Sequence, residues 1–385
     1  MNKTGRNSCV GVIGAGTMGS GIAQLAASFG HKVVLFDANT AVMQQAAGKL
    51  KKSLDGLVEK GKITATQAHD IISNIHGASV FEEFKSCNLV IEAVVEDLTI
   101  KQDIFRKLEQ ITSTDCILAT NTSSLSVTSI ASACNIAGRV IGIHFFNPAP
   151  IMPLVEIIPG IASDMGVLND ARSLIDSWKK TTVIARDTPG FIVNRVARPF
   201  YGEAIRIYEE GIADLATIDW AMKEIGGFKM GPFELMDFIG NDVNFKVTET
   251  VWTQLFYDDR YKPSLTQKRL YEAGFWGRKK GRGYYQYNEN ASMQEPKKDT
   301  TLGQEIFIRI ISMLINEAYD ALYLNIASKE DLELAMTKGV NYPKGLIQWA
   351  DDIGVKKILD KLEQLHSTYL EDRYRPSVLL RKMVK

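Results

Sequence analysis

Residues 10–23 read VGVIGAGTMGSGIA, and they decide the fold of the first part of the chain. Gly14, Gly16 and Gly19 form a G-x-G-x-x-G pattern that follows an apolar run and opens a helical pattern. Glycines at these positions permit a tight turn and let the backbone approach a pyrophosphate at a helix N-terminus. The stretch therefore predicts a dinucleotide site, with contacts along the whole loop: Gly14, Ala15, Gly16, Thr17, Met18 and Gly19.

Asp37 indicates which dinucleotide binds. The next apolar run, HKVVLFD, ends in this aspartate, where an acidic side chain accepts the ribose hydroxyls of NAD. At ~4 Å and an effective dielectric near 20, each unit of charge on a 2′-phosphate would be repelled by about 4 kcal/mol. Residues 38–39 supply no arginine to offset this repulsion. We therefore expect NAD as the cofactor, with a glycine turn and a helix-capping aspartate as the alternative interpretation.

Apolar runs that lack polar alternation recur through the first part of the chain. They cover residues 9–13, 32–36, 89–93, 116–119 and 139–143, with helical patterns between them. Runs of this kind are typical of parallel strands that are covered on both faces. The sequence thus predicts an α/β fold of the Rossmann type, with a doubly wound parallel sheet.

Composition limits the kinds of partner that the protein can have. The 385 residues are 45% hydrophobic and 23% charged, and 45 basic side chains balance 45 acidic ones. No overall field favours nucleic acid or an anionic membrane. The start, MNKTGRNS, is too short and too polar for a signal peptide, and no apolar run approaches the ~18 residues of a membrane span. Four scattered cysteines are read as free thiols and predict no metal site, so we expect a cytoplasmic protein.

An internal repeat organises the second, helical part. Residues 203–240 align with residues 317–354 at an offset of 114, and DDRYKPS (258–264) recurs as EDRYRPS (371–377). Coincidences in one register point to a duplication. We therefore predict three domains: a Rossmann-like domain at 1–187, a helical domain at 188–290, and a degenerate second copy of it at 300–385.

His144 is the candidate for proton transfer. It stands in HFFNPAP directly after the run 139–143, where ligands bind in doubly wound folds. An imidazole can take a hydroxyl proton as a hydride leaves the same carbon, which is typically worth ~10²- to 10⁴-fold. Glu156, in the strand-like run 154–158, is the candidate to orient it. A capping histidine and a solvated glutamate are the ordinary alternatives.

Several motifs together carry a family resemblance. They are GVIGAGTMGSGIA, Asp37, VIEAVVED (90–97), TNTSSL (120–125), HFFNPAP with LVEII, DTPGFIVNR (187–195) and MGPFELMD (230–237). In this order they resemble the L-3-hydroxyacyl-CoA dehydrogenases, in particular the bacterial 3-hydroxybutyryl-CoA dehydrogenases. The resemblance implies oxidation of an L-3-hydroxyacyl-CoA, of short chain, to the 3-ketoacyl-CoA by NAD, or the reverse. It places the protein in fatty acid metabolism and β-oxidation, with an acyl-CoA as its partner.

The resemblance also assigns roles to individual residues. His144 corresponds to the general base and Glu156 to its carboxylate partner. Ser123 and Asn194 correspond to the polar groups that hold the substrate oxygens, and Asn147 to the asparagine beside the nicotinamide. From the residues alone, Ser123 could be a helix cap and Asn194 a polar residue on an exposed helix face. The sequence does not decide whether Ser123 or its neighbour Ser124 is the serine that contacts the substrate.

Five further residues match the family less specifically. Glu96, Lys101 and Lys279 match positions near the cofactor, and Ser53 and Lys60 match positions that contact coenzyme A. For Glu96 and Lys101 the alternative is an ordinary helix start. For Ser53 and Lys60 it is a solvated basic face, and for Lys279 a basic turn.

The second helical copy is expected to be catalytically silent. Asn194 aligns with Ile308, so the copy lacks this polar residue. In the family this domain mediates dimerisation, and a duplicated copy replaces the partner's domain. We therefore expect residues 300–385 to form an internal pseudo-dimer with residues 188–290, with further homo-oligomers open. The apolar periodicity of residues 306–315 requires burial against another surface.

Two other functions stay open at this point. One is a dehydrogenase of free 3-hydroxy acids or sugar acids on the same scaffold. The other is a structural protein that keeps the NAD site without the chemistry. The presence of His144, Glu156, Ser123 and Asn194 together argues against the second.

Overall fold

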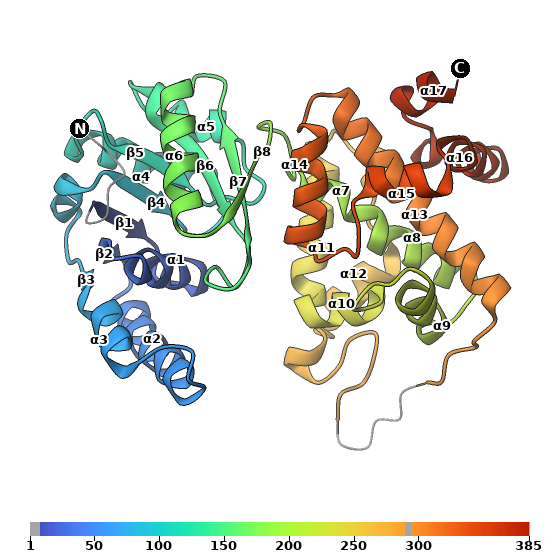
Figure 1. Cartoon of the computed structure of the whole chain (residues 1–385), viewed down its shortest axis with the longest axis horizontal. Coiled ribbons are helices and arrows are strands. Elements are labelled where there is room, and N and C mark those ends of the chain that lie inside the picture. The colour runs from blue at the N-terminus through green and yellow to red at the C-terminus, as the bar shows by residue number, and fades with distance from the viewer. Residues whose placement is uncertain (1–7, 289–293, 385) are drawn as a thin grey trace. The chain divides into compact units, whose positions relative to one another are not determined.

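A computed structural model describes residues 8–288 and 294–384 (Figure 1). The chain divides into two compact units, with the boundary between Asp187 and Thr188. Residues 1–7 of the polar start, and residue 290, the predicted end of the first helical copy, lie outside the described residues.

The first unit is built on an eight-stranded sheet in the order β3-β2-β1-β4-β5-β6-β7-β8. The strands are β1 (Cys9–Ile13), β2 (Lys32–Phe36), β3 (Ile75–Gly77), β4 (Leu89–Glu92), β5 (Ile117–Thr120), β6 (Val140–Phe145), β7 (Leu154–Pro159) and β8 (Thr181–Ile184). Strands β1 to β6 pair in parallel, whereas β7 runs antiparallel to β6 and β8 parallel to β7. The strand order reverses beside β1, so a ligand crevice is expected at its carboxyl end.

Helices cover both faces of this sheet, which explains the apolar strands. One face packs against α1 (Thr17–Ser28), α2 (Thr40–Glu59), α3 (Ala65–Ser73) and α6 (Met165–Ser177). The other face packs against α4 (Leu98–Ile111) and α5 (Val127–Ala131). A strand buried on both sides has no solvent face on which polar residues would alternate. The predicted doubly wound α/β fold is therefore confirmed (Figure 1).

Two strands were absent from the prediction, and both are short. β3 has three residues and contains His76, and β8 lies at the opposite edge with the sequence TTVI. Neither stretch is long enough or apolar enough to be distinguished from a loop by its pattern. Edge strands are half solvated, so their sequences carry a weaker signal.

The second unit is helical. Its helices are α7 (Val193–Val196), α8 (Arg198–Glu209), α9 (Leu215–Trp220), α10 (Pro232–Ile239), α11 (Asn241–Gln254), α12 (Leu265–Glu272), α13 (Thr300–Tyr323), α14 (Lys329–Leu334), α15 (Leu346–Ile353), α16 (Val355–Tyr369) and α17 (Val378–Val384). In Figure 1, α13 is the long orange helix that runs beside α8. It also packs against α15, α16 and α17.

The duplication is visible element by element. Helices α14 and α15 begin and end 114 residues after α9 and α10. Even a π-helical turn recurs, at Ala221–Ile225 and again at Ala335–Gly339. A single helix, α13, spans the residues that correspond to both α7 and α8. The predicted duplication of the all-α part is therefore confirmed.

The two copies contact each other through mirrored ion pairs. The guanidinium Nε of Arg195 lies 2.8 Å from Glu317 Oε1, and the corresponding Nε of Arg309 lies 2.6 Å from Glu203 Oε1. Arg195 and Glu203 belong to the first copy, and their partners are the 114-residue equivalents in the second. All four side chains are buried. Each copy therefore offers the same two charged groups to the other.

A pair of tyrosines repeats the same exchange. Tyr261 of the first copy donates its hydroxyl hydrogen bond to Glu317, and Tyr374 of the second copy donates to Glu203 at 2.9 Å. Their numbers differ by 113, as in the DDRYKPS repeat. Each buried carboxylate is thus held by an arginine and a tyrosine.

The helices over residues 8–288 and 294–384 include none with the length and apolar character needed to cross a membrane.

Candidate functional site

The glycine loop between β1 and α1 has little room for side chains. Gly14 has φ +99°, and a Cβ there would lie 2.5 Å from the carbonyl oxygen of Ala93. A Cβ on Gly19 would lie 1.7 Å from the carbonyl oxygen of Gly14. Both positions therefore require glycine for packing within the protein. Gly16 differs, because a Cβ there would have no protein atom within 4 Å.

The open space at Gly16 fits a dinucleotide. Gly16 is the N-cap of α1, and no side chain caps this helix. Backbone N–H groups at a helix N-terminus carry partial positive charge and bind phosphate. Since neither packing nor a side chain uses this end of α1, its amides and the open space above Gly16 suit a pyrophosphate. The site residues predicted from Gly14 to Gly19 thus lie on one loop at the carboxyl end of β1.

Asp37 follows β2 and braces this loop. Its Oδ2 accepts a hydrogen bond of 2.8 Å from the amide of Ala15, and its Oδ1 accepts one of 2.9 Å from the amide of Asn39. The carboxylate is therefore fixed next to the glycine loop, at the position from which a ribose would be held. Its contact with ribose hydroxyls stays a prediction.

His144 and Glu156 form a buried pair. They are directly opposite residues of the antiparallel strands β6 and β7, and His144 Nδ1 lies 2.7 Å from Glu156 Oε2. Glu156 is fully buried and His144 is 6% exposed. Two side chains on the same face of adjacent strands are within reach of each other, so the register alone creates the contact. A neutral imidazole that donates Nδ1–H to this carboxylate carries its lone pair on Nε2.

A turn of serines follows the neighbouring strand β5. Asn121 Oδ1 accepts a 2.8 Å hydrogen bond from the amide of Phe145, the residue after His144. This bond ties the start of the turn to the end of β6. Ser123 and Ser124 come next, both half-buried. The serine turn and His144 therefore lie at the same edge of the sheet.

Glu96 is hydrogen bonded to the turn that follows β5. Its Oε1 accepts hydrogen bonds from Thr122, Ser123 and Ser124. Burial alone would raise the pKa of Glu96, but the ammonium of Lys101 and the hydroxyl of Thr122 bring the pKa below its usual value. Glu96 is therefore a carboxylate that organises the serine turn.

Lys101 is buried and paired on two sides. Its Nζ lies 2.7 Å from Glu92 Oε1 and 3.3 Å from Glu96 Oε2, and its side chain is 1% exposed. Glu92 also accepts a 2.8 Å bond from the Thr120 hydroxyl. The ammonium is therefore used inside the protein, and the expected contacts of Lys101 and Glu96 with the cofactor stay predictions.

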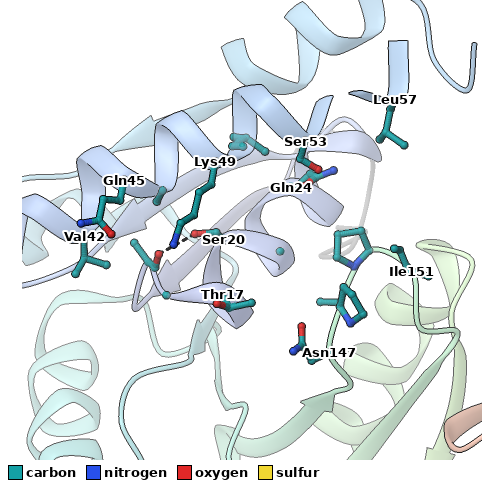
Figure 2. A pocket seen from close by; sticks show the side chains of 18 residues that line it. Thr17, Ser20, Gln24, Val42, Gln45, Lys49, Ser53, Leu57, Asn147 and Ile151 are labelled. Atoms are coloured by element: carbon teal, nitrogen blue, oxygen red, sulfur yellow. Dashed lines mark hydrogen bonds between the residues drawn. The ribbon is translucent and has the colours of Figure 1, made fainter. Parts of the chain in front are cut away.

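A cavity of about 500 Å³ opens between α1, α2 and the segment 147–151 (Figure 2). Figure 2 shows Lys49 and Ser53 pointing from α2 toward this cavity, with Asn147 on its far side. Apolar residues of α2, such as Leu57, complete the wall. The cavity thus brings together the predicted residues Ser53 and Asn147. Lys60, the C-cap of α2, is exposed and does not line it.

Two predicted residues belong to the second unit. Asn194 is half-buried on the short helix α7. The ammonium of Lys279 lies 2.6 Å from Asp242 and is 44% exposed. Their proposed contacts with substrate and cofactor stay predictions.

Three further side chains near the candidate site were not predicted from the sequence. Asp187 accepts hydrogen bonds from the amides of Val127 and Thr128, and so holds the segment that follows the serine turn. Glu92 anchors Lys101, and Lys49 lines the cavity. Lys49 could have been found from its i, i+4 spacing to Ser53. The partners of Asp187 and Glu92 are distant in sequence, so no local pattern reveals them.

Comparisons with known proteins agree with this geometry. A model of the 3-hydroxyacyl-CoA dehydrogenase NAD binding domain matches residues 9–188, and a model of the C-terminal domain of the same family matches residues 190–287 and 306–385. The first unit is therefore an NAD-binding domain, as predicted.

Individual relatives extend over most of the chain. The chain is 35% identical to the 3-hydroxyadipyl-CoA dehydrogenase of Escherichia coli K12, over 97% of this chain and 96% of that protein. It is 41% identical to a probable 3-hydroxybutyryl-CoA dehydrogenase of Bacillus subtilis, over 73% of this chain and 98% of that protein. A crystal structure of 3-hydroxybutyryl-CoA dehydrogenase from E. coli K12 superposes with a TM-score of 0.92 at 35% identity, over 98% of both chains. The chain belongs to the 3-hydroxyacyl-CoA dehydrogenase family.

Proposed function

We propose that this protein oxidises an L-3-hydroxyacyl-CoA to the 3-ketoacyl-CoA with NAD, or catalyses the reverse reaction, in fatty acid or related acyl-CoA metabolism. The observation that carries the proposal is the buried pair of His144 and Glu156, whose Nδ1 and Oε2 are 2.7 Å apart. This pair stands at the edge of an NAD-binding domain of the family. An oriented imidazole next to a hydride acceptor is the arrangement that alcohol oxidation needs.

His144 and Glu156 have different roles in the proposed proton transfer. The Nε2 atom of His144 takes the proton of the 3-hydroxyl group. Glu156 holds Nδ1–H, fixes the ring and stabilises the imidazolium that forms. Bound NAD supplies the acceptor for the hydride that leaves the same carbon. In the reverse direction the imidazolium returns its proton to the carbonyl oxygen.

Neutral donors support the reacting oxygen in this proposal. Ser123, in the turn after β5, and Asn194, on α7, donate hydrogen bonds to the substrate oxygens. Asn147 contributes beside the nicotinamide. Such donors polarise a developing carbonyl without a metal ion. The half-burial of Ser123 and Asn194 and the family membership of the chain support these assignments.

The cavity on α2 suits the long carrier part of the substrate. Its wall combines apolar residues with Ser53 and Lys49, so a pantetheine chain would meet apolar surface and polar groups in turn. Lys60, on the exposed end of α2, would meet the phosphates of coenzyme A as a point charge. A short acyl chain, such as 3-hydroxybutyryl, is the substrate that we propose.

An adipyl substrate is the second candidate, because a relative that matches the whole chain is a 3-hydroxyadipyl-CoA dehydrogenase. Comparing kcat/KM for 3-hydroxybutyryl-CoA, 3-hydroxyadipyl-CoA and a longer acyl-CoA would rank the candidates. A marked preference for the adipyl compound would replace the short-chain proposal.

The reaction itself is tested by following NADH oxidation with acetoacetyl-CoA and with free acetoacetate. We expect turnover with the thioester only. Turnover of the free acid would favour a dehydrogenase of free 3-hydroxy acids. NADH binding without any turnover would favour an NAD-binding structural protein.

We also propose that the two helical copies form an internal pseudo-dimer. The mirrored pairs Arg195–Glu317 and Arg309–Glu203 support it, because a two-fold interface repeats each contact with the roles exchanged. Further association of chains and a cytoplasmic location stay predictions.

A further inference from the structure

Two cysteine side chains meet at the start of β1. The Sγ atoms of Cys9 and Cys87 lie 3.1 Å apart. Cys9 is the first residue of β1, and Cys87 lies two residues before β4, which pairs with β1 in parallel. The amide of Asn88 donates a 2.9 Å hydrogen bond to the carbonyl oxygen of Cys9, and the Asn88 side chain accepts one of 3.1 Å from the amide of Cys9. The sheet therefore holds the two sulfur atoms against each other.

The approach that a disulfide bond requires is short. Disulfide sulfurs lie about 2.0 Å apart, so the two Sγ atoms form the bond by closing about 1 Å. Cys9 and Cys87 are separated by 78 positions in the chain, and the pairing of β1 with β4 brings them together. The contact is therefore a property of the folded domain.

The two thiols differ in reactivity. Cys9 is partly exposed, whereas Cys87 is 2% exposed. The hydrogen bond from Cys87 lowers the pKa of Cys9 from 9.0 to about 7, although burial opposes this shift. The same hydrogen bond, together with burial, raises the pKa of Cys87. A substantial fraction of Cys9 is therefore the thiolate at neutral pH, and the thiolate is the form that reacts.

The two remaining cysteines lack these features. Cys116 is 1% exposed and Cys134 is 9% exposed. Burial raises the pKa of Cys116 to about 12 and the pKa of Cys134 to about 11. Their nearest hydrogen-bond acceptors are backbone carbonyl oxygens, of Ile117 at 3.5 Å and of Phe105 at 3.8 Å. Both are buried, protonated thiols, and such thiols are inert toward oxidants.

We propose that Cys9 and Cys87 are a redox-sensitive pair, which hydrogen peroxide oxidises to a disulfide bond and a dithiol reduces again. The Cys9 thiolate attacks one oxygen of the peroxide, the O–O bond breaks, and the released hydroxide takes up a proton to form water. Cys9 is then a sulfenic acid. The Cys87 sulfur attacks the Cys9 sulfur, the S–O bond breaks, and the hydroxyl group leaves with the Cys87 proton as a second water. The two thiols lose two electrons, and the peroxide is reduced to two waters.

The position of the pair determines what the bond does. It lies at the amino ends of β1 and β4, whereas the glycine loop follows the carboxyl end of β1. A resolving thiol beside the sulfenic acid prevents further oxidation of Cys9 to the sulfinic acid. The disulfide therefore protects Cys9 from irreversible oxidation and ties together two neighbouring strands of the NAD-binding domain.

Peptide mapping of the full chain after treatment with a small excess of hydrogen peroxide tests the pair. We expect linked peptides that contain Cys9 and Cys87, an intact mass lower by two hydrogen atoms, and recovery of the original mass after dithiothreitol. Cys134→Ser is the matched control, because it removes one thiol and should form the same bond at a rate within about twofold of the original. A protein in which both thiols stay free, or in which another pair is linked, would overturn the proposal.

Single variants of the pair separate the two roles. Cys87→Ser is expected to stop the oxidation at the sulfenic acid of Cys9, which dimedone traps. Cys9→Ser is expected to slow the consumption of peroxide at least about tenfold. A Cys9→Ser protein that consumes peroxide at the original rate would overturn the assignment of Cys9 as the reactive thiol.

Thermal unfolding of the oxidised and the reduced protein tests whether the fold accommodates the bond. A disulfide between residues 78 positions apart restrains the unfolded chain, so oxidation should raise the melting temperature by at least about 3 °C. The same treatment should leave the melting temperature of Cys9→Ser unchanged. A melting temperature of the original protein that stays unchanged or falls would show that the bond does not fit the sheet. None of these measurements depends on acyl-CoA turnover, so the inference stands or falls independently of the proposed function.

Discussion

The imidazole of His144 owes its position to a single register. Strands β6 and β7 place it directly opposite Glu156, so both side chains leave the sheet on one face. A shift of the register by one residue would send them to opposite faces. The pairing of β6 with β7 therefore holds the two side chains opposite each other more rigidly than a loop would.

Replacing either member of this pair should lower the turnover number and leave the affinity for NAD nearly unchanged. His144→Ala is expected to lower turnover by at least about 10²-fold, because it removes the base, with little change in NAD affinity. Glu156→Gln keeps the volume and should lower kcat less, by about 10-fold, since the ring stays but its charged form loses a partner. Steady-state kinetics and NADH titration give the two quantities. Unaltered turnover of His144→Ala would remove this residue from the role of base.

At the scale of the residue, the sequence predicted which residues belong to the candidate site, and their roles stay predictions, whereas most contacts among them were not predicted. His144 could be found because it directly follows an apolar run, and Glu156 because it lies within the next one. The gathering of Thr122, Ser123 and Ser124 around Glu96 could not, because it depends on how closely α4 approaches the end of β5. Such distances are set by packing between elements and leave no periodicity in the chain.

The turn between β1 and α1 is an element with two kinds of glycine. Gly19 is required by the fold, whereas Gly16 borders open space. Gly19→Ala should destabilise the protein strongly, because a Cβ would lie 1.7 Å from a carbonyl oxygen. Gly16→Ala should leave the melting temperature nearly unchanged and weaken NADH binding at least about tenfold, because the methyl group occupies the approach of the pyrophosphate.

Thermal unfolding and fluorescence titration of the two variants measure these effects, and each variant is the control for the other. A stable Gly16→Ala protein with full NADH affinity would show that the dinucleotide does not approach this glycine.

Helix α10 depends on a buried aspartate. Asp219 accepts hydrogen bonds of 2.9 and 3.0 Å from the amides of Phe233 and Glu234 in its first turn. Burial raises the pKa of Asp219 from 3.8 to about 7. The folded protein therefore keeps a proton on this group over a range of pH in which the unfolded chain has lost it. Linkage then requires the free energy of unfolding to fall as pH rises between these two values.

Asp219→Asn isolates this contribution, because the amide cannot titrate. The free energy of unfolding of the original protein minus that of the variant should decrease as pH rises from about 4 to about 7, and then level off. Urea unfolding at several pH values measures the difference. A difference that rises with pH in this window would contradict the raised pKa.

Elements were predicted well where burial is complete and poorly where it is partial. β1 and β2 begin and end at the predicted residues, since both are buried on two faces. β3 and β8 were missed because they lie at the two edges of the sheet. The repeat was readable over residues 203–240 and 258–264, because many residues of these stretches recur in the second copy at an offset of 114 and then 113.

At the scale of the whole molecule, we propose that the second helical copy has a structural role and packs against the first copy. Its helix α13 is buried on most sides, including the predicted apolar residues Ile306, Ile310, Ile311, Leu314 and Ile315. Deleting residues 300–385 would leave Arg195 and Glu203 in the first copy without their partners. The apolar surface that α13 covers would then be exposed to water, and a contiguous exposed apolar face favours association.

We therefore expect the truncated chain to aggregate or to dimerise through the exposed face. Size-exclusion chromatography with light scattering, at the same concentrations as the full chain, measures this. A truncated chain that stays a monomer with an unchanged melting temperature would contradict the pseudo-dimer.

The mirrored ion pairs have a consequence for evolution. In a dimer of two identical chains, every substitution at the interface occurs twice, so a change that suits one side is imposed on the other. When both halves lie in one polypeptide, this constraint disappears, and the halves stay together at any dilution because the linkage gives a local concentration on the order of millimolar. One half is then free to drift, as the exchange of Asn194 for Ile308 illustrates, while Arg309 and Glu317 still hold it in place.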